Sequence, residues 1–263
     1  MKKYLKIIWT VIRNAYIRDS KIPGFVFVSL VTSMLEIVIT IVFFDIIFSA
    51  SESIAGWTFY QVLFLYALAK TITLFHSALT KNGIQAMAHS YVRMGELDFY
   101  LTKPIDSMFL VSVSKPKIYS FVSMLLAIGL GTYSLIHSGT HFGLASMIWF
   151  VVLAFTTTLL YYYIEVLTII PTFWLLQAWS LADAINKLQQ FMRYPNGIFS
   201  RAIRYGLTFI FPIMVVAYYP VKVLFHGPTF SDITTVFAVT TAFILITRYL
   251  WRLGERSYSS ASS

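Results

Sequence analysis

The sequence contains no cysteine and few charged residues, and both shortages limit what the protein can be. Without cysteine, the chain can form no disulfide, no thiolate metal site and no cysteine-nucleophile active site. Charged residues make up 12% of the 263 residues, whereas a soluble domain carries about 25%. Hydrophobic residues make up 58% of the chain, and the mean hydropathy is +0.73. This composition predicts an all-α integral membrane protein.

The common catalytic motifs are also missing. The sequence has no HExxH, GxSxG, Walker lysine loop or GxGxxG. Its histidines are scattered, and the closest pair, His137 and His141, flanks a Ser-Gly turn. We therefore expect this chain to bind no metal or cofactor and to hydrolyse no nucleotide by itself. An intramembrane enzyme would need a polar triad or a metal cluster at one depth, for which the candidates are Glu36, Lys70 and His76.

The net charge of +9 is high for so few charged residues. A basic chain can bind nucleic acid, but the charge has another explanation in a membrane protein. Cytoplasmic loops carry an excess of Lys and Arg, and basic surfaces contact anionic lipids. We expect membrane lipids as partners and no nucleic acid.

Apolar segments recur along the chain and predict one transmembrane domain over residues 1–263. Residues 1–22 place apolar side chains at helical spacing with basic residues off that stripe, so an amphipathic helix in the membrane interface is expected. Six spans are expected, at residues 24–48, 57–79, 118–136, 142–163, 166–189 and 233–251. The third span carries a row of small residues, Ser123, Ala127 and Gly131, which predicts a helix-packing face.

Polar residues gather between the second and third spans. Residues 81–117 combine charges with a helix-compatible sequence, so we expect them to face water and to be available to a soluble partner. The Ser-rich tail, residues 257–263, is expected to be disordered.

The apolar tract over residues 142–182 is long enough for two spans. We divide it near residues 161–165, where the sequence YYYIE supplies an aromatic belt and a charge. The chain beyond this division fits two topologies. In the first, residues 166–189 are the fifth span and residues 194–222 form an outer re-entrant hairpin, because Pro212 interrupts a short apolar run.

In the second topology, residues 166–205 stay in the cytoplasm and residues 206–223 are the fifth span. The positive-inside rule favours this alternative, because several basic residues lie in the disputed segment. These are Lys187, Arg193, Arg201 and Arg204. Both topologies give six spans with both termini in the cytoplasm, and they differ in the side on which residues 190–205 lie.

Two charges lie deep in adjacent predicted spans. Glu36 is about 18 Å and Lys70 about 14 Å from the inner face, at 1.5 Å per residue. An unpaired charge at the bilayer centre costs at least about 2.5–3.5 kcal/mol. A partner or a wet cavity is therefore expected for each charge, and because the two spans are antiparallel neighbours, Glu36 and Lys70 are candidates to pair. Two roles remain open, an ion pair that fixes helix register and a polar lining of a substrate path.

Two motifs resemble those of bacterial ABC-2-type exporter permeases. The segment GELDFYLTKPID resembles a G-x-L-D-x-x-L-x-x-P-V-x-x-x-F pattern after the second span. The matching residues are Gly95, Leu97, Asp98, Leu101, Pro104 and Phe109, with Ile105 at the Val position. A later segment is similar to a Y-P-x-x-I-F … L-T-F-x-I-P-x-x-x-x-A-Y-x-P pattern. It matches through Tyr194, Pro195, Ile198, Phe199, Leu207, Thr208, Phe209, Pro212, Ala217, Tyr218 and Pro220, while Ser200 replaces a usual Pro.

The resemblance covers essentially the whole chain and implies a fold. That fold is the type-2 ABC exporter permease fold, with an amino-terminal interface helix, six transmembrane helices and a re-entrant helical hairpin before the last span. It places residues 194–222 outside and so favours the first topology. The hairpin residues implied are Tyr194, Pro195, Pro212 and Pro220.

The resemblance also implies partners. Two permeases, identical or paralogous, would each dock one cytosolic ABC ATPase, and ATP and Mg²⁺ would be bound by the ATPase. A coupling helix would lie within residues 81–117. The coupling residues implied are Arg93, Gly95, Glu96, Leu97, Asp98, Lys103 and Pro104.

The expected function is therefore that of a permease subunit of an ATP-driven exporter in the bacterial plasma membrane. It would move an amphiphilic substrate outward, and lipids, peptides and drugs are all candidates. The alternatives are an intramembrane enzyme and a non-catalytic membrane scaffold, and a scaffold would show no coupling to an ATPase.

Overall fold

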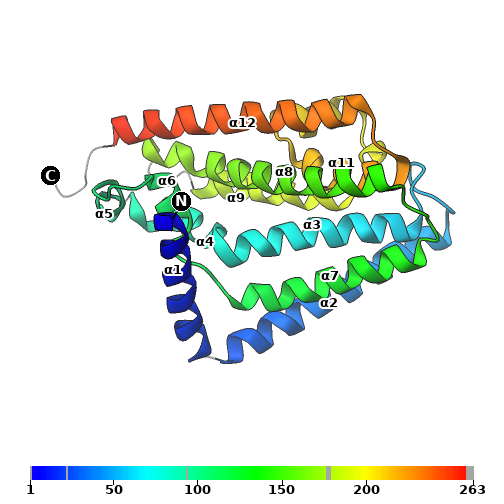
Figure 1. The fold of residues 1–263 in the computed structure, drawn as a ribbon, viewed down its shortest axis with the longest axis horizontal. Helices are drawn as coiled ribbons and strands as arrows, with labels where there is room; N and C mark the ends of the chain where they lie inside the picture. Colours follow the sequence, from blue (N-terminus) through cyan, green and yellow to red (C-terminus); the bar gives the residue numbers. More distant parts are fainter. Residues whose placement is uncertain (1, 22, 93, 176–178, 259–263) are drawn as a thin grey trace.

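A computed structural model describes residues 2–21, 23–92, 94–175 and 179–258 (Figure 1). These residues form helices and no strand, with one isolated bridge between Ile54 and Trp57. The prediction of an all-α protein is confirmed. Long helices lie side by side, while α1 (Lys2–Ser20) crosses one end of the bundle.

Within the part of the chain that the structure describes, five helices are long and apolar enough to cross a membrane. They are α2 (Pro23–Ser49), α3 (Phe59–Leu79), α7 (Tyr119–His137), α8 (Leu144–Ile169) and α12 (Phe230–Ser257). A bent pair, Arg201–Ile210 and Ile213–His226, would make a sixth if it counts as one span, but its halves meet at 100°. The predicted spans 24–48, 57–79 and 118–136 agree with α2, α3 and α7 to within two residues.

The last helix is longer than expected at both ends, because α12 covers residues 230–257 rather than 233–251. Thr229 caps its first turn by accepting a hydrogen bond from the backbone of Asp232 at 3.2 Å. Of the predicted disordered tail, residues 259–263 lie outside the described residues.

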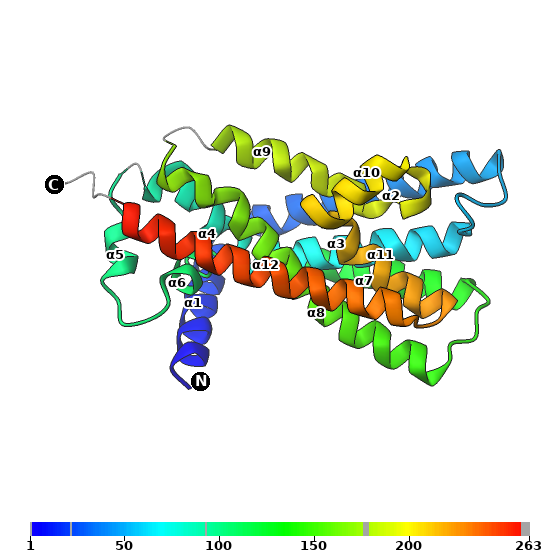
Figure 2. The same cartoon turned by 90° about the horizontal axis from the view of Figure 1, so that it is seen from above.

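The predicted division between residues 142–163 and 166–189 is wrong. Helix α8 runs unbroken through residues 161–165, and a 3-10 turn, η2 (Ile170–Phe173), extends it. Glu165 does not mark a boundary, because it is buried inside the bundle beside basic groups of α3 and α4. The chain turns only after Pro171, and α9 (Trp179–Leu188) then runs back toward the opposite end (Figure 2).

The two ends of the bundle differ. The short elements α4 (Lys81–Ala86), η1 (Met87–Tyr91), α5 (Leu97–Leu101) and α6 (Ser107–Ser112) gather at one end with α1 and the carboxyl end of α12 (Figure 1). The opposite end holds α10 (Arg201–Tyr205), η5 (Gly206–Ile210) and α11 (Ile213–His226) (Figure 2). Short 3-10 turns, η3 (Gln189–Arg193) and η4 (Asn196–Ile198), connect α9 to this end.

Helix α3 lies at the centre of the main hydrophobic core. Small residues let α7 approach it closely, as predicted: Ser123, Ala127 and Gly131 are buried, and a Cβ on Gly131 would lie 3.4 Å from Cβ of Ala67. A second core under α4, η1, α5 and α6 joins Tyr91 and other residues of these elements to the ends of α8 and α12.

Gly83 allows α4 to pack directly on α6. A Cβ at this position would overlap the carbonyl oxygens of Val111 and Ser112. We therefore expect Gly83→Ala to destabilise the folded protein by about 1–3 kcal/mol, the usual range for overpacking. The control is Gly129→Ala in α7, where no atom lies within 4 Å of the new Cβ.

Gly129→Ala should instead stabilise its helix by about 0.5–1 kcal/mol. Thermal unfolding in detergent measures both variants. Equal melting temperatures for the two would contradict the packing described for α4 and α6.

Candidate functional site

Three charged side chains meet between α2, α3 and η3, and we call Glu36, Lys70 and Arg193 the Glu36 cluster. The Lys70 ammonium donates a hydrogen bond to Oε2 of Glu36, which confirms the predicted pairing. Nη2 of Arg193 lies 3.6 Å from the other carboxylate oxygen, and the guanidinium carbon lies 5.5 Å from the centre of the Tyr66 ring. One acid therefore contacts two cations from distant parts of the sequence.

The Glu36 cluster connects α2 to the rest of the bundle. Helix α2 buries the smallest share of its surface among the five long helices, so a specific polar contact matters more there than elsewhere. A small cavity of about 60 Å³ beside the cluster is lined by Tyr66, Gln189 and the three charged residues. The side chains of Glu36 and Lys70 are 38% and 15% exposed, so the cluster borders the bundle surface.

A second group of polar residues, the Glu165 cluster, consists of His76, Lys81 and Glu165. Nζ of Lys81 and Nδ1 of His76 each lie 3.8 Å from one carboxylate oxygen of Glu165. Glu165 is buried, and neither of its carboxylate oxygens accepts a hydrogen bond from the described residues. Because Lys81 is the first residue of α4, this cluster joins the 81–117 segment to α8.

The ring of His76 is fixed by two hydrogen bonds. Its Nε2 lies 3.0 Å from the carbonyl oxygen of Thr158, and its Nδ1 lies 3.0 Å from the hydroxyl of Thr80. A carbonyl oxygen only accepts hydrogen bonds, so Nε2 carries a proton and donates it. His76 therefore belongs to the Glu165 cluster, and the structure does not bring it together with Glu36 and Lys70.

Three members of these clusters, Arg193, Glu165 and Lys81, are not among the site residues predicted from the sequence, where Lys81 is only the first residue of the polar segment 81–117. In the sequence, Arg193 is one of several basic residues in the segment that the two topologies place on different sides of the membrane. Glu165 only marks the predicted division between two spans. For Glu165 a signal is present, because it is the one acid in the 26 residues of α8. An isolated carboxylate inside an apolar helix requires a partner or a wet cavity.

The residues expected to couple to an ATPase lie around α5. Gly95 has a positive φ of 73°, which turns the chain into the helix. Leu97 is fully buried, while Glu96 is exposed and so are the neighbouring apolar side chains of Met94 (70%) and Phe99 (62%). Arg93 lies outside the described residues.

The rest of this segment is held in place by its neighbours. Lys103 lies over the ring of Phe99, with Nζ 4.3 Å from the centroid, and the Pro104 carbonyl accepts a hydrogen bond from Lys3 of α1 at 3.1 Å. Asp98 is half-buried in α5, and the cap of the next helix is Asp106, which accepts from the Phe109 backbone at 2.8 Å.

Contacts with α12 anchor the same segment from the other side. The hydroxyl of Ser107 donates to Glu255, and Nε1 of Trp251 donates to Glu255 at 2.9 Å. Burial raises the pKa of Tyr100, which packs against Tyr91 with ring centroids 4.9 Å apart, so this phenol stays neutral. Residues 81–117 thus form a surface that is held in place by contacts with α1, α8 and α12.

The residues expected in a hairpin lie against the connection between α2 and α3. A Cβ added at Gly197 would lie 2.6 Å from Cβ of Ala55, and the ring of Trp57 lies 5.4 Å from that of Tyr218. Tyr194 packs on Phe44 near the end of α2, with centroids 6.1 Å apart.

The prolines of this segment have different effects. Pro195 is the N-cap residue of η4 and is buried. Pro212 is the N-cap residue of α11 at the 100° bend. Pro220 lies inside α11 without ending the helix, which continues past the predicted end of the hairpin at residue 222 to His226.

Several helices long and apolar enough to cross a membrane, with paired charges between them, define an all-α multi-pass membrane protein. A family model described as ABC-2 family transporter protein matches residues 34–262, and the chain belongs to this family. No curated protein matches the sequence. Membership confirms the resemblance seen in the motifs, makes the chain the membrane subunit of an ABC transporter, and implies partnership with an ABC ATPase.

The pairing of Glu36 and Lys70 can be tested by a double-mutant cycle. Glu36→Gln and Lys70→Gln should each lower the free energy of unfolding, because each leaves a charge without its partner in a poorly solvated place. The double variant should recover part of the loss, with a coupling energy of about 0.5–3 kcal/mol.

Unfolding of the detergent-solubilised protein measures the cycle. The control is Asp45→Asn on the same helix, where the carboxylate is exposed, and this variant should have little effect. Strictly additive losses from Glu36→Gln and Lys70→Gln would show that the two charges do not stabilise each other.

Proposed function

We propose that this chain is the permease subunit of an ATP-driven exporter that moves an amphiphilic substrate outward across the bacterial plasma membrane, with both termini in the cytoplasm. Lipids, peptides and drugs all fit the term amphiphilic. The observation that carries the proposal is the α5 surface, where Met94, Glu96 and Phe99 are exposed around the buried Leu97. The match to a transporter family over residues 34–262 supports it.

The α5 surface has the features of a docking site for a soluble ATPase. Aromatic residues and Met are enriched in protein–protein interfaces relative to the rest of a protein surface, and Phe99 and Met94 are both exposed here. Leu97 anchors the short helix in the core below, so a force applied to α5 would act on the core rather than bend a loose loop. The ATPase, and not this chain, would bind ATP and Mg²⁺.

Movement of α5 has two direct routes into the bundle. One runs through α4 and Lys81 to Glu165, which lies in the carboxyl-terminal half of the span formed by α8 and η2. The other runs through Ser107 to Glu255 and Trp251 of α12. Both routes consist of hydrogen bonds and ion pairs between buried or half-buried groups. Such contacts fix the positions of two groups relative to each other, so a displacement of one group moves the other. We propose that these contacts couple closure of the ATPase pair to the spans.

Contacts at the opposite end support the first topology, with residues 194–222 as an outer re-entrant hairpin. Helices α2 and α3 each cross once, so the connection between them lies on the side opposite to residues 81–117. Gly197 and Tyr218 contact Ala55 and Trp57 of that connection. If residues 81–117 face the cytoplasm, the hairpin then faces outside, against the count of basic residues.

A second permease, identical or paralogous, would complete the transporter. Helix α2 exposes a continuous set of large apolar side chains, as expected of a surface that meets lipid or another permease. These include Phe27, Val31, Leu35, Val38, Ile39 and Ile46.

Reversal of charge on the α5 surface should disturb coupling without removing the protein from the membrane. We expect Glu96→Arg and Asp98→Arg to weaken docking of the ATPase about tenfold, which corresponds to about 1.4 kcal/mol. The substrate-stimulated ATPase activity of the reconstituted complex should fall accordingly.

The matched control is Glu52→Arg, which reverses an exposed acid in the α2–α3 connection at the other end. This variant should hydrolyse ATP like the wild type. If both α5 variants kept the substrate-stimulated ATPase activity of the wild type, this segment would not be the docking site.

Thiol labelling decides the topology, because the chain has no cysteine of its own. Asn196 lies in the disputed segment but is buried, so the exposed Ser200 is the better position. We expect Ser200→Cys to react with a membrane-impermeant maleimide in intact cells. Ser51→Cys should behave identically, and Ser257→Cys should react only after the membrane is opened. Labelling of Ser200→Cys together with Ser257→Cys would move the hairpin to the cytoplasm.

A further inference from the structure

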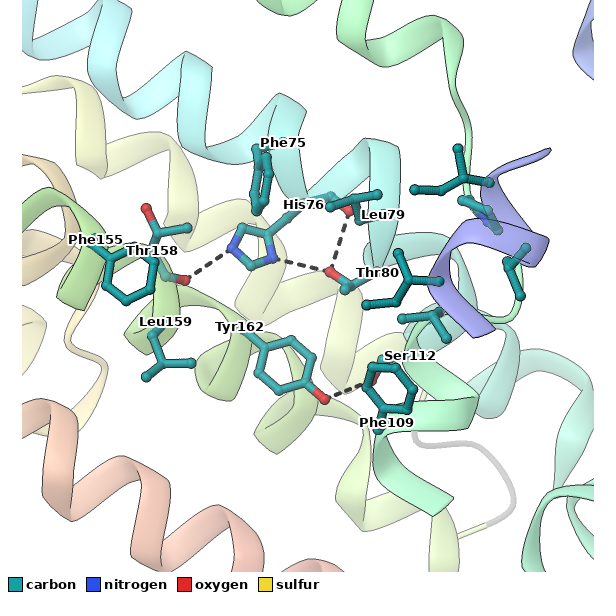
Figure 3. Close-up of a pocket in the computed structure, with 15 residues that line it drawn as sticks. Phe75, His76, Leu79, Thr80, Phe109, Ser112, Phe155, Thr158, Leu159 and Tyr162 are labelled. Atoms are coloured by element: carbon teal, nitrogen blue, oxygen red, sulfur yellow. Dashed lines mark hydrogen bonds between the residues drawn. The ribbon is translucent and has the colours of Figure 1, made fainter. Parts of the chain in front are cut away.

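A cavity of about 420 Å³ lies between α1, α3, α6 and α8 (Figure 3). It is separate from the Glu36 cluster and from the α5 surface. Its walls are aliphatic and aromatic side chains, and its size falls in the range of about 300–1,000 Å³ that small-molecule sites have. Phe155, at its edge on α8, is 77% exposed, so the cavity lies next to the surface that α8 presents to lipid.

The polar atoms around the cavity already have partners. Figure 3 shows the His76 ring between Thr158 and Thr80, and the hydroxyl of Tyr162 beside that of Ser112, 2.9 Å away. None of these groups needs a ligand to complete its hydrogen bonds. An apolar cavity of this kind does not hold ordered water, so its occupant is an apolar group.

Helix α1 forms one wall of the cavity with its apolar face. Ile8, Val11 and Ile12, at spacings of three and four residues, line the cavity. On the other face Trp9 is exposed. The inner face of α1 therefore meets a space rather than a closely packed neighbour in this part. Empty space forfeits the dispersion contacts of the atoms that line it, so hydrocarbon would fill it in a membrane.

Cations gather next to this cavity. Pro116 lines the cavity, and its carbonyl accepts a hydrogen bond from Arg18 at the end of α1. Arg18 also pairs with Asp19 at 2.9 Å. The next residue after Pro116, Lys117, is half-buried, and its ammonium forms no hydrogen bond with a described residue. Burial lowers the pKa of Lys117, the nearby charges of Arg18 and Lys81 lower it further, and Asp19 raises it, so three cations and one carboxylate lie close together here.

We propose that the cavity is a phospholipid site: one acyl chain fills the space between α1 and the bundle, and the phosphate is held by Lys117 and Arg18. The apolar cavity fits the acyl chain of a phospholipid. The cation beside it, which has no hydrogen-bond partner among the described residues, fits the phosphate. The lipid would belong to the leaflet next to α1, and it would connect α1 to α3, α6 and α8. This site is independent of the direction of transport and of the transported substrate.

Photo-crosslinking tests the acyl-chain part. The full-length protein is reconstituted in vesicles of phosphatidylglycerol that contain a fraction with a diazirine on one acyl chain, and the labelled peptides are identified by mass spectrometry. We expect adducts on the cavity-lining stretches of α3, α6 and α8. Leu159→Trp, which fills the cavity from α8, should lower these adducts at least fivefold.

The matched control is Val152→Trp on the same helix. Val152 and Leu159 are 38% and 39% exposed, but Val152 is not among the residues that line the cavity. Its substitution should leave the adducts unchanged. Equal labelling in the two variants, or adducts only on lipid-exposed surfaces such as α2, would overturn the proposal.

Native mass spectrometry tests the phosphate part and does not depend on the Trp variants. The protein should retain one phosphatidylglycerol after delipidation in mild detergent, and Lys117→Gln should lower that retained fraction severalfold. Lys115→Gln changes an exposed lysine two residues away and should have no effect. If Lys117→Gln and Lys115→Gln retained the lipid equally, Lys117 would not bind the phosphate. If the wild-type protein retained no lipid, the proposed phospholipid site would be overturned.

Discussion

A charge inside a hydrocarbon layer must meet a partner, and the two charge clusters of this protein show how that requirement organises the bundle. Glu36 of α2 contacts Lys70 of α3 and Arg193 of η3. Glu165 of α8 lies between His76 of α3 and Lys81 of α4. Each acid thus brings together segments far apart in the sequence, because leaving it unpaired in the membrane would cost several kcal/mol. Helix α3 contributes to both clusters and is also the helix most enclosed by the core.

The positions of the two clusters give the two ends of the molecule different properties. Lys81 begins α4, so the Glu165 cluster fastens the short helices around α5 to the bundle. Arg193 ends the connection from α9, so the Glu36 cluster fastens the segment that leads into α10 and α11. In a transporter, the first end would receive force from an ATPase and the second would respond next to the pathway. The same contacts that satisfy buried charges would then also carry the conformational change.

The sequence predicts the structure correctly where the signal lies within one helix, or where two charges lie at similar depths in the membrane. The lengths of α2, α3 and α7 follow from apolar runs, and the small residues of α7 indicate a close approach to α3. Pairing of Glu36 with Lys70 follows from their depths on adjacent spans. The reasoning failed at Glu165, because a charge in an apolar run also marks the end of many spans. The local sequence YYYIE does not reveal that Lys81 and His76, which come much earlier in the chain, lie against it.

By itself, the amino-acid sequence determined the membrane class, the bounds of α2, α3 and α7, and the family motifs around residues 95–109 and 194–220. These depend on composition and on nearest neighbours along the chain. Only the tertiary structure decided that α8 continues past Glu165, that Arg193 joins the Glu36 pair, and that a cavity separates α1 from α3, α6 and α8. The physical reason is that the free energy of a buried charge, or of an unfilled space, depends on which distant segments surround it. Periodicity along one helix carries no information about those neighbours.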